Sequence, residues 1–226
     1  MLFSDRRDAG RQLAERLAML KLRDPVVLAL PRGGIPVGFE VAQALAAPLD
    51  LLLVRKLGAP FEEELAIGAL TDGTGPELVT DARLVADLHV SASYLEEAKA
   101  KALQEIERRR QVYLGDRSPV DLAGRTAIVV DDGIATGATM LAALRGTRRR
   151  KPAQVVLAVP VATDHALRRL RHEADQTVCL HVPEVFPAVG QFYDRFPQLR
   201  DKEVIALLDR ARHFAAQPSS THRSQP

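Results

Sequence analysis

Two adjacent carboxylates, Asp131 and Asp132, follow an apolar run and precede a segment rich in glycine and threonine. The run, residues 127–130, has the composition of a strand buried on both faces of a parallel sheet. Gly133 and Gly137 allow a tight turn, and good helix formers follow it. Because the first N–H groups of a helix have no partner inside it, they can bind an anion. The sequence therefore predicts an anion site directly after two carboxylates.

The side chains around this turn narrow the choice of anion. The hydroxyls of Thr136 and Thr139 add donors, and each hydrogen bond to a charged oxygen contributes about 1.5–3 kcal/mol. Carboxylates accept hydrogen bonds, and vicinal sugar hydroxyls donate them. We therefore expect a ribose whose 5-phosphate lies in the loop and whose 2- and 3-hydroxyls meet Asp131 and Asp132.

Other interpretations of this segment explain less of it. A Walker loop needs Gly-x-x-x-x-Gly-Lys-Ser/Thr, and the sequence has no such run. A phosphatase with an aspartyl nucleophile needs two acids separated by one residue, whereas Asp131 and Asp132 are adjacent. A purely structural turn accounts for Gly137, but not for two acids beside two threonines.

The segment resembles the phosphoribosyl-pyrophosphate (PRPP) signature of the type I phosphoribosyltransferases: four hydrophobic residues, two acids, two small or apolar residues, and a short Thr/Gly/Thr loop. The resemblance extends over about residues 25–181. It implies an α/β fold with a central parallel sheet flanked by helices and a small hood made of terminal or inserted segments. It also implies Mg²⁺-dependent displacement of pyrophosphate from PRPP by a nitrogenous acceptor.

The resemblance assigns a role to each residue that matches the motif. Asp131 and Asp132 would hold the ribose and stabilise the positive charge that develops in an oxocarbenium-like transition state. Mg²⁺ would be held by PRPP oxygens and water, with no direct protein ligand. The 5-phosphate would be bound by Ala135, Thr136, Gly137, Ala138 and Thr139.

A second loop is a candidate site for the pyrophosphate. The apolar run 26–30 leads into residues 31–38, where Arg32 offers a two-pronged donor and glycines let the main chain approach an anion. A dinucleotide-binding turn is the alternative, but the glycines do not follow Gly-x-Gly-x-x-Gly, and Pro36 lies inside the turn. By resemblance, a cis peptide joins Arg32 to Gly33, and pyrophosphate is bound by Arg32, Gly33 and Gly34.

A third apolar run, residues 49–54, ends at the cations Arg55 and Lys56. By itself this could be a solvated strand end. By resemblance, both cations meet the pyrophosphate and act in catalysis, and the following loop closes over the reaction. Residues 57–64, before a strand near 66–70, have the composition of such a lid.

The remaining pattern alternates strands and helices, as in a parallel sheet. It predicts a single domain over residues 1–216 and a disordered tail over 217–226. A charged helix at 94–113 dominates an insertion at about 71–121, and its run Arg108-Arg109-Arg110 is typical of a solvated helix face. Helices are also expected at 5–22, 39–46 and 201–215, and strands at 155–161 and 177–181.

A C-terminal extension at about 182–216 is a candidate for the hood. Several of the chain's few aromatic residues gather in residues 183–193, and a base needs an apolar slot with stacking surfaces. Phe186, Phe192 and Tyr193 are therefore candidates for contact with the base, although ordinary packing of the extension explains them equally well.

Composition sets outer limits on function. The 226 residues are 46% hydrophobic and carry a net charge of +2, which does not indicate nucleic acid as a partner. The lone Cys179 excludes an intrachain disulfide and reads as a buried strand residue. No run reaches membrane-spanning length and no signal peptide is evident, so we expect a cytoplasmic enzyme, with a homodimer left open.

The acceptor is not determined by these motifs. Arg32-Gly33-Gly34 resembles the pyrophosphate loop of xanthine-guanine enzymes, whereas Ala135-Thr136-Gly137 resembles the phosphate loop of adenine enzymes. By resemblance, 6-oxopurine enzymes carry an aspartate where this chain has Ala135. A PRPP- or nucleotide-binding regulatory protein without turnover is the alternative, although no helix-turn-helix or aromatic RNA platform is evident.

Overall fold

A computed structural model of the chain describes residues 2–72 and 77–214. Its centre is a five-stranded sheet in the order β2-β1-β6-β7-β8, in which every neighbouring pair is parallel. The strands are β1 Pro25–Ala29, β2 Leu49–Leu51, β6 Thr126–Val130, β7 Gln154–Val161 and β8 Gln176–His181. The predicted parallel sheet is confirmed, and the signature carboxylates follow its middle strand.

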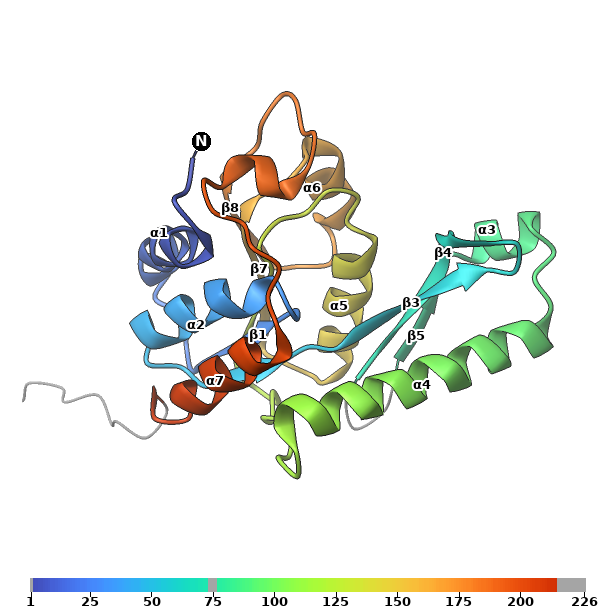
Figure 1. Cartoon of the computed structure of the whole chain (residues 1–226), viewed down its shortest axis with the longest axis horizontal. Helices are drawn as coiled ribbons and strands as arrows, with labels where there is room; N and C mark the ends of the chain where they lie inside the picture. The colour runs from blue at the N-terminus through green and yellow to red at the C-terminus, as the bar shows by residue number, and fades with distance from the viewer. Residues whose placement is uncertain (1, 73–76, 215–226) are drawn as a thin grey trace, which may run out of the picture.

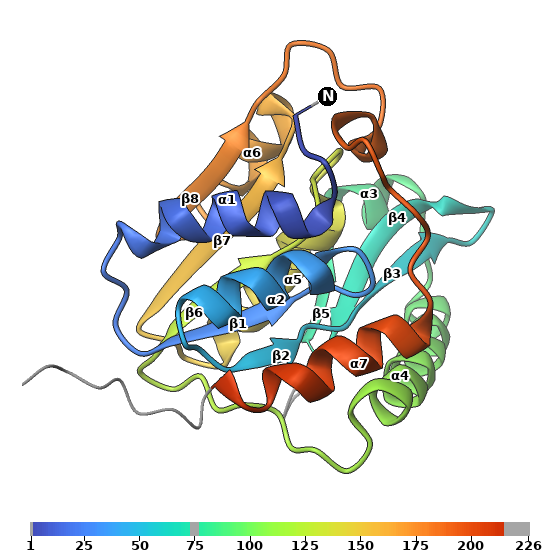
Figure 2. The ribbon, with the colours of Figure 1, turned by 60° about the vertical axis from the view of Figure 1, so that its left-hand side comes forward.

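Helices cover both faces of this sheet (Figure 2). Alternate residues on each strand face opposite sides, so Val27, Ile128 and Val156 pack under one layer while Val26, Ala127 and Val155 pack under the other. The first layer is α1 Arg6–Ala18 and α2 Gly34–Ala44, and the second is α5 Ala138–Arg149 and α6 Asp164–Leu170. The buried strands therefore form the core that positions the loops at their carboxyl ends.

A second, antiparallel sheet stands beside the core (Figure 1). It consists of β3 Val54–Ala59, β4 Glu62–Thr71 and β5 Glu77–Thr80, and α3 Ala82–Asp87 follows it. The long helix α4 Ala92–Leu114 runs along this sheet and packs on it through Ala102 and Ile106. The inserted segment is thus a sheet with helices, which supplies the hood expected of the fold.

The structure corrects the expected boundaries of this insertion. The strand expected at 49–54 ends at Leu51, and the chain leaves the parallel sheet before β3 begins at Val54. The segment 57–64, expected as a loop, forms the end of β3, a turn and the start of β4. Gly58 suggested a loop, but it lies at a register shift between the paired strands. The insertion therefore starts at Val54 instead of residue 71.

The two terminal segments lie against each other. The main-chain N–H groups of Leu2 and Phe3 donate to Phe192 O at 3.2 and 3.1 Å, and the Asp194 N–H donates to Phe3 O at 2.9 Å. The C-terminal segment includes the short 3-10 helix Val189–Phe192 and ends in α7 Asp201–Ala211. The helix expected at 201–215 is therefore shorter, and the tail expected at 217–226 lies outside the described residues.

A buried charge cluster ties the insertion to the core. The Asp72 carboxylate is 7% exposed, accepts the Leu53 N–H at 3.0 Å and lies 3.5 Å from Arg110 Nη1. Burial, opposed by the Leu53 hydrogen bond, raises the pKa of Asp72 to about 6, and the charge of Asp50 adds to the rise. Asp72 thus connects Leu53, between β2 and β3, with Arg110 of α4. Its protonation state therefore affects the contacts that hold the inserted segment to the core.

This raised pKa predicts a pH dependence of stability. The folded chain holds the Asp72 proton more tightly than the unfolded chain, so this group's contribution to the free energy of unfolding falls as pH rises from about 4 to about 6. Denaturant titrations of the native chain and Asp72→Asn should diverge over that range. Asp87→Asn, an exposed change on α3, is the control. Parallel stability curves for Asp72→Asn and the native chain would contradict the assignment.

Within residues 2–72 and 77–214, no helix combines the length and the apolar character needed to cross a membrane.

Candidate active site

The signature carboxylates lie where β6 ends in the centre of the sheet. The Asp132 N–H donates to Asp131 Oδ1 at 2.8 Å. Beyond them the loop is fixed to the neighbouring strand, because the Ile134 N–H donates to Val161 O at 2.9 Å and the Thr163 N–H donates to Ile134 O at 3.1 Å. This attachment holds the carboxylates at a fixed place beside the loop that follows.

That loop opens α5 as the sequence predicts. Gly137 has φ +77°, in the left-handed region that glycine adopts without a steric cost, and its carbonyl accepts the Leu141 N–H at 2.8 Å. The Thr163 hydroxyl donates to Ala135 O at 2.7 Å and holds the loop from the side. Ala135 and Thr136 are exposed, while Thr139 is half-buried. The five predicted phosphate-binding residues are therefore gathered at the N-terminus of α5, whose first N–H groups are free of helical partners.

The loop after β1 lies against the carboxylates. A Cβ on Gly33 would be 2.1 Å from Asp132 Oδ2, and a Cβ on Gly34 would be 2.8 Å from Val130 O. Both positions therefore need glycine for the two loops to approach this closely. The cis peptide bond joins Pro31 to Arg32, one residue earlier than the expected bond between Arg32 and Gly33.

An arginine from the first helix completes this arrangement. Arg6 Nε donates to Asp132 Oδ2 at 2.8 Å, Arg6 Nη1 donates to Pro197 O at 2.9 Å, and the guanidinium lies 3.6 Å from the Phe196 ring centroid. The side chains of Arg6 and Asp132 are only 10% and 14% exposed. Together with Arg32 they line a cavity of about 500 Å³. The site thus unites groups from α1, the β1 loop, the β6 loop and the C-terminal segment.

The two carboxyl groups differ in their electrostatic surroundings. Burial and the neighbouring charge of Asp132 raise the pKa of Asp131 well above its usual value. Burial also raises the pKa of Asp132, but the ion pair and hydrogen bond from Arg6 oppose this rise. Arg6 therefore favours the ionised form of Asp132.

Comparison with known sequences identifies this arrangement. The profile of the phosphoribosyl transferase domain family matches residues 6–195, a range that contains every loop described above. The chain belongs to this family. A candidate phosphoribosyl transferase of Mycobacterium tuberculosis, found in two strains, is 50% identical over 215 residues and covers 95% of the chain. The chain spans 48% of the length of these relatives.

A solved structure shares this fold. The crystal structure of the Thermus thermophilus protein TT1426 is 45% identical in sequence and superposes with a TM-score of 0.82. The match covers 92% of this chain and 98% of that protein. The similarity therefore extends over the inserted sheet and the terminal segments as well as the parallel core.

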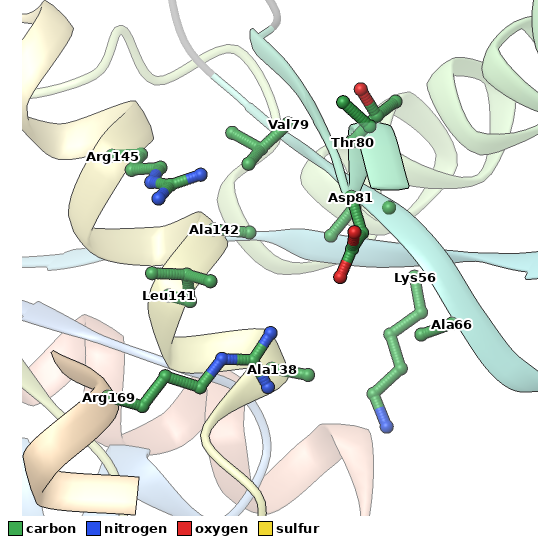
Figure 3. A pocket seen from close by; sticks show the side chains of 13 residues that line it. Lys56, Ala66, Val79, Thr80, Asp81, Ala138, Leu141, Ala142, Arg145 and Arg169 are labelled. Carbon is green, nitrogen blue, oxygen red and sulfur yellow. The ribbon is translucent and has the colours of Figure 1, made fainter. Parts of the chain in front are cut away.

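Arg55 and Lys56 do not point to the same side of β3. Consecutive strand residues face opposite sides, and Arg55 pairs with the buried Leu70 while Lys56 pairs with Ala69. Lys56 lines a cavity of about 340 Å³ between the inserted sheet and α5, at the end marked by Ala138 (Figure 3). The structure thus places Lys56 beside the phosphate loop, and this cavity does not include Arg32.

Arg169 is a second cation at the same end of α5. Figure 3 shows Arg169 of α6 and Lys56 of β3 directed toward the region around Ala138. Arg145 lies two turns further along α5, and its Nε donates to Glu173 Oε1 at 2.8 Å. Within the described ranges, neither Lys56 nor Arg169 has a carboxylate in ion-pair distance. The predicted phosphate loop is therefore flanked by two cations from different elements.

The three aromatic candidates separate into two groups. Tyr193 is 2% exposed, packs between Phe3 and Phe196 at 5.3 and 4.9 Å, and donates its hydroxyl to Asp132 O at 2.6 Å. Its ring has no face open to a base, and it supports the signature instead. Phe186 and Phe192 are half-buried, with ring centroids 5.1 Å apart, on the segment after β8. These two remain candidates for contact with an acceptor.

Sequence reasoning did not single out Arg6, Phe196 or Arg169. Arg6 lies in the first turn of an ordinary amphipathic helix, 126 residues before its partner Asp132. Phe196 stands just outside the aromatic cluster at 183–193. Arg169 lies in a basic run that also fits the end of a helix. None of the three carries a local motif, and the fold alone brings them to the site.

Proposed function

We propose that this chain transfers the 5-phosphoribosyl group of PRPP to a nitrogenous base or amine and releases pyrophosphate. The observation that carries the proposal is the convergence of Asp131 and Asp132 with two anion-binding loops at the carboxyl end of the parallel sheet. A mononucleotide-sized ligand with phosphates at both ends of a ribose fits this arrangement. The fold and the family relationship support the same reaction class.

In the proposed reaction, the bond from ribose C1 to the pyrophosphate oxygen breaks and its electron pair leaves with pyrophosphate. An acceptor nitrogen forms the new bond to C1 and then loses a proton. Positive charge develops on the ribose in between, and the carboxylates of Asp131 and Asp132 would stabilise it. Arg32 and the main chain at Gly33 would bind the leaving pyrophosphate, and residues 135–139 would hold the 5-phosphate.

Mg²⁺ would assist by neutralising charge on the pyrophosphate oxygens. The site fits this ion, because the Asp132 carboxyl group lines the cavity proposed for the pyrophosphate, and Mg²⁺ prefers oxygen ligands such as those of phosphates and water. The described residues contain no cluster of three or more His, Cys, Asp or Glu side chains placed to hold a metal. As the resemblance implies, the ion would be carried by PRPP oxygens and water, with no direct protein ligand.

Binding of Mg²⁺-PRPP tests the proposal without knowledge of the acceptor. A hundredfold excess over the dissociation constant should stabilise the folded chain by about 2.7 kcal/mol. A thermal scan with PRPP, ATP or NAD, each with Mg²⁺, measures this effect. An upward shift with ATP or NAD and none with PRPP would refute the assignment.

The acceptor should be limited by Ala135. Its methyl group lies in the exposed part of the phosphate loop and cannot exchange a proton, whereas a carboxyl at this position could act as general acid or base toward a purine ring nitrogen. General acid–base help typically contributes about 10²–10⁴-fold in rate. We therefore expect hypoxanthine and guanine to be poor acceptors compared with adenine, a pyrimidine or another amine.

Values of kcat/KM for these acceptors at fixed PRPP measure this preference. Ala135→Asp should improve turnover of the 6-oxopurines, while Ala135→Asn, which cannot exchange a proton in the same way, should not. Efficient use of hypoxanthine or guanine by the native chain would show that another residue supplies the proton.

A regulatory protein that binds PRPP or a nucleotide without turnover is the second candidate. PRPP binding without pyrophosphate release in the presence of any acceptor would favour it. The enzymatic proposal includes a cytoplasmic location. It holds for either a monomer or a homodimer.

A further inference from the structure

A second cavity lies on the other side of Arg32 from the signature. Arg32 lines both the cavity that contains Asp132 and a cavity of about 390 Å³ reached by Arg108 and Arg109 of α4. Tyr113 and Asp201 complete its charged and polar lining. The helix expected to present a solvated basic face therefore delivers two of its arginines to the pyrophosphate loop.

The three consecutive arginines of α4 do not behave alike. Arg110 lies away from this cavity, with Nη1 3.5 Å from Asp72 Oδ2 and Nη2 donating to Arg117 O at 3.2 Å. Arg108 and Arg109 both pair with Glu105, at 2.9 and 2.7 Å. One carboxylate thus orients two guanidinium groups, and it neutralises only one of their charges.

The remaining acid in the cavity is also shared. Asp201 Oδ1 lies 3.8 Å from Arg32 Nη1 and accepts the Tyr113 hydroxyl at 2.6 Å. The pKa of Tyr113 is raised to about 12, chiefly by burial, so its hydroxyl stays neutral and keeps donating to Asp201. Three guanidinium groups therefore line a cavity whose own lining contains one carboxylate, and the cavity carries net positive charge.

We infer that this cavity is a second anion site, distinct from the PRPP site, and that it binds a compact polyphosphate such as inorganic pyrophosphate. One guanidinium group can donate two parallel hydrogen bonds to phosphate oxygens. Three such groups around one cavity match a small anion that carries several charges. Arg32 would be the residue common to both sites. If the proposed transfer reaction takes place, pyrophosphate could pass across Arg32 from the catalytic site into this cavity.

Calorimetric titration with sodium pyrophosphate and Mg²⁺ at physiological salt tests the site without turnover. We expect about two pyrophosphates per native chain and about one per chain of Arg108→Ala/Arg109→Ala. The affinity at the second site should fall at least about tenfold for each guanidinium removed singly. Lys99→Ala/Lys101→Ala is the matched control. Like the arginine variant, it removes two positive charges from α4 and introduces two alanines, which favour the helix.

The outcomes separate this inference from the proposed function. Loss of one pyrophosphate in the arginine variant and in no other, with PRPP binding unchanged, supports the second site. Equal stoichiometry in the native chain and Arg108→Ala/Arg109→Ala overturns it, even if PRPP binds as proposed. An equal loss in the lysine control also overturns it, because the effect would then be general charge. If PRPP does not bind but the arginine variant alone loses a pyrophosphate, the proposed function fails and the second site stands.

Discussion

Replacement of Asp131 by Asn is expected to lower kcat about 10²–10³-fold, the effect typical of losing one preorganised electrostatic contact to a transition state. The amide keeps the shape of the side chain and can still meet a ribose hydroxyl, but it removes the charge that would face the oxocarbenium-like centre. PRPP affinity should change much less than turnover, because the charge on ribose develops only in the transition state. Initial rates at saturating PRPP and a separate PRPP titration measure the two effects.

Asp131 suits this test better than Asp132, because Asp132 also pairs with Arg6. Asp116→Asn, an exposed change just after α4, is the control for the loss of one negative charge. Turnover of Asp131→Asn equal to that of the control would rule out the role assigned to this carboxylate. A parallel loss of PRPP affinity and rate would instead make Asp131 a binding group without special effect on the transition state.

Replacement of Arg6 by Met should destabilise the fold by about 3–5 kcal/mol, which is the usual cost of leaving a buried charge without its partner. For a chain of this size, at about 2–4 °C per kcal/mol, we expect the melting temperature to fall by about 6–20 °C. The variant would leave Asp132 buried and unpaired, and it would lose the hydrogen bond to Pro197 and the contact with Phe196. Thermal and denaturant unfolding at pH 7 measure the change.

Arg7→Met is the matched control, since Arg7 is exposed and lies 3.9 Å from its acidic neighbour Glu40. The double variant Arg6→Met/Asp132→Asn should recover part of the lost stability, because the unpaired charge is gone. The loss in Arg6→Met should also shrink at low pH, where Asp132 can take up a proton. Equal stability of Arg6→Met and Arg7→Met would show that the ion pair contributes little.

The signature and its surroundings could be predicted from sequence because their information is local. A short apolar strand, two acids, Gly137 and the first turn of α5 follow one another without interruption, and each has a structural consequence that does not depend on distant residues. The same holds for Gly33 and Gly34, whose lack of a side chain marks a close approach of the main chain. The parallel sheet follows from the alternation of such units.

Of the inserted sheet, only the strand near residues 66–70 was predicted, and it lies within β4. The rest was not predicted, because β3 and the turn after it carry the residues of a loop. Gly58 and Pro60 interrupt the pattern of β3, yet the register shift and the turn accommodate both. The strands gain their stability from packing against α4 and α5, which no short window of sequence reveals. The opposite directions of Arg55 and Lys56 follow from this strand assignment and could not be seen from a loop.

The contacts across the site were beyond sequence reasoning for a different reason. Arg6 and Tyr193 both reach Asp132 from distant parts of the chain. Nothing in the local sequence marks Arg6, and the aromatic cluster around Tyr193 suggested contact with a base instead of with Asp132. Their positions depend on the pairing of the two terminal segments, which is a property of the complete fold. A residue whose role depends on such long-range contacts can be found only once the structure is known.

Release of pyrophosphate from Mg²⁺-PRPP tests the central claim most directly. The native chain and Asp131→Asn would be compared across adenine, hypoxanthine, guanine, pyrimidines and simple amines. Acceptor-dependent release by the native chain, reduced at least about a hundredfold in Asp131→Asn, is the predicted result. Contradiction would come from a native chain that binds PRPP and releases no pyrophosphate with any acceptor, or from an Asp131→Asn variant that releases it at the native rate.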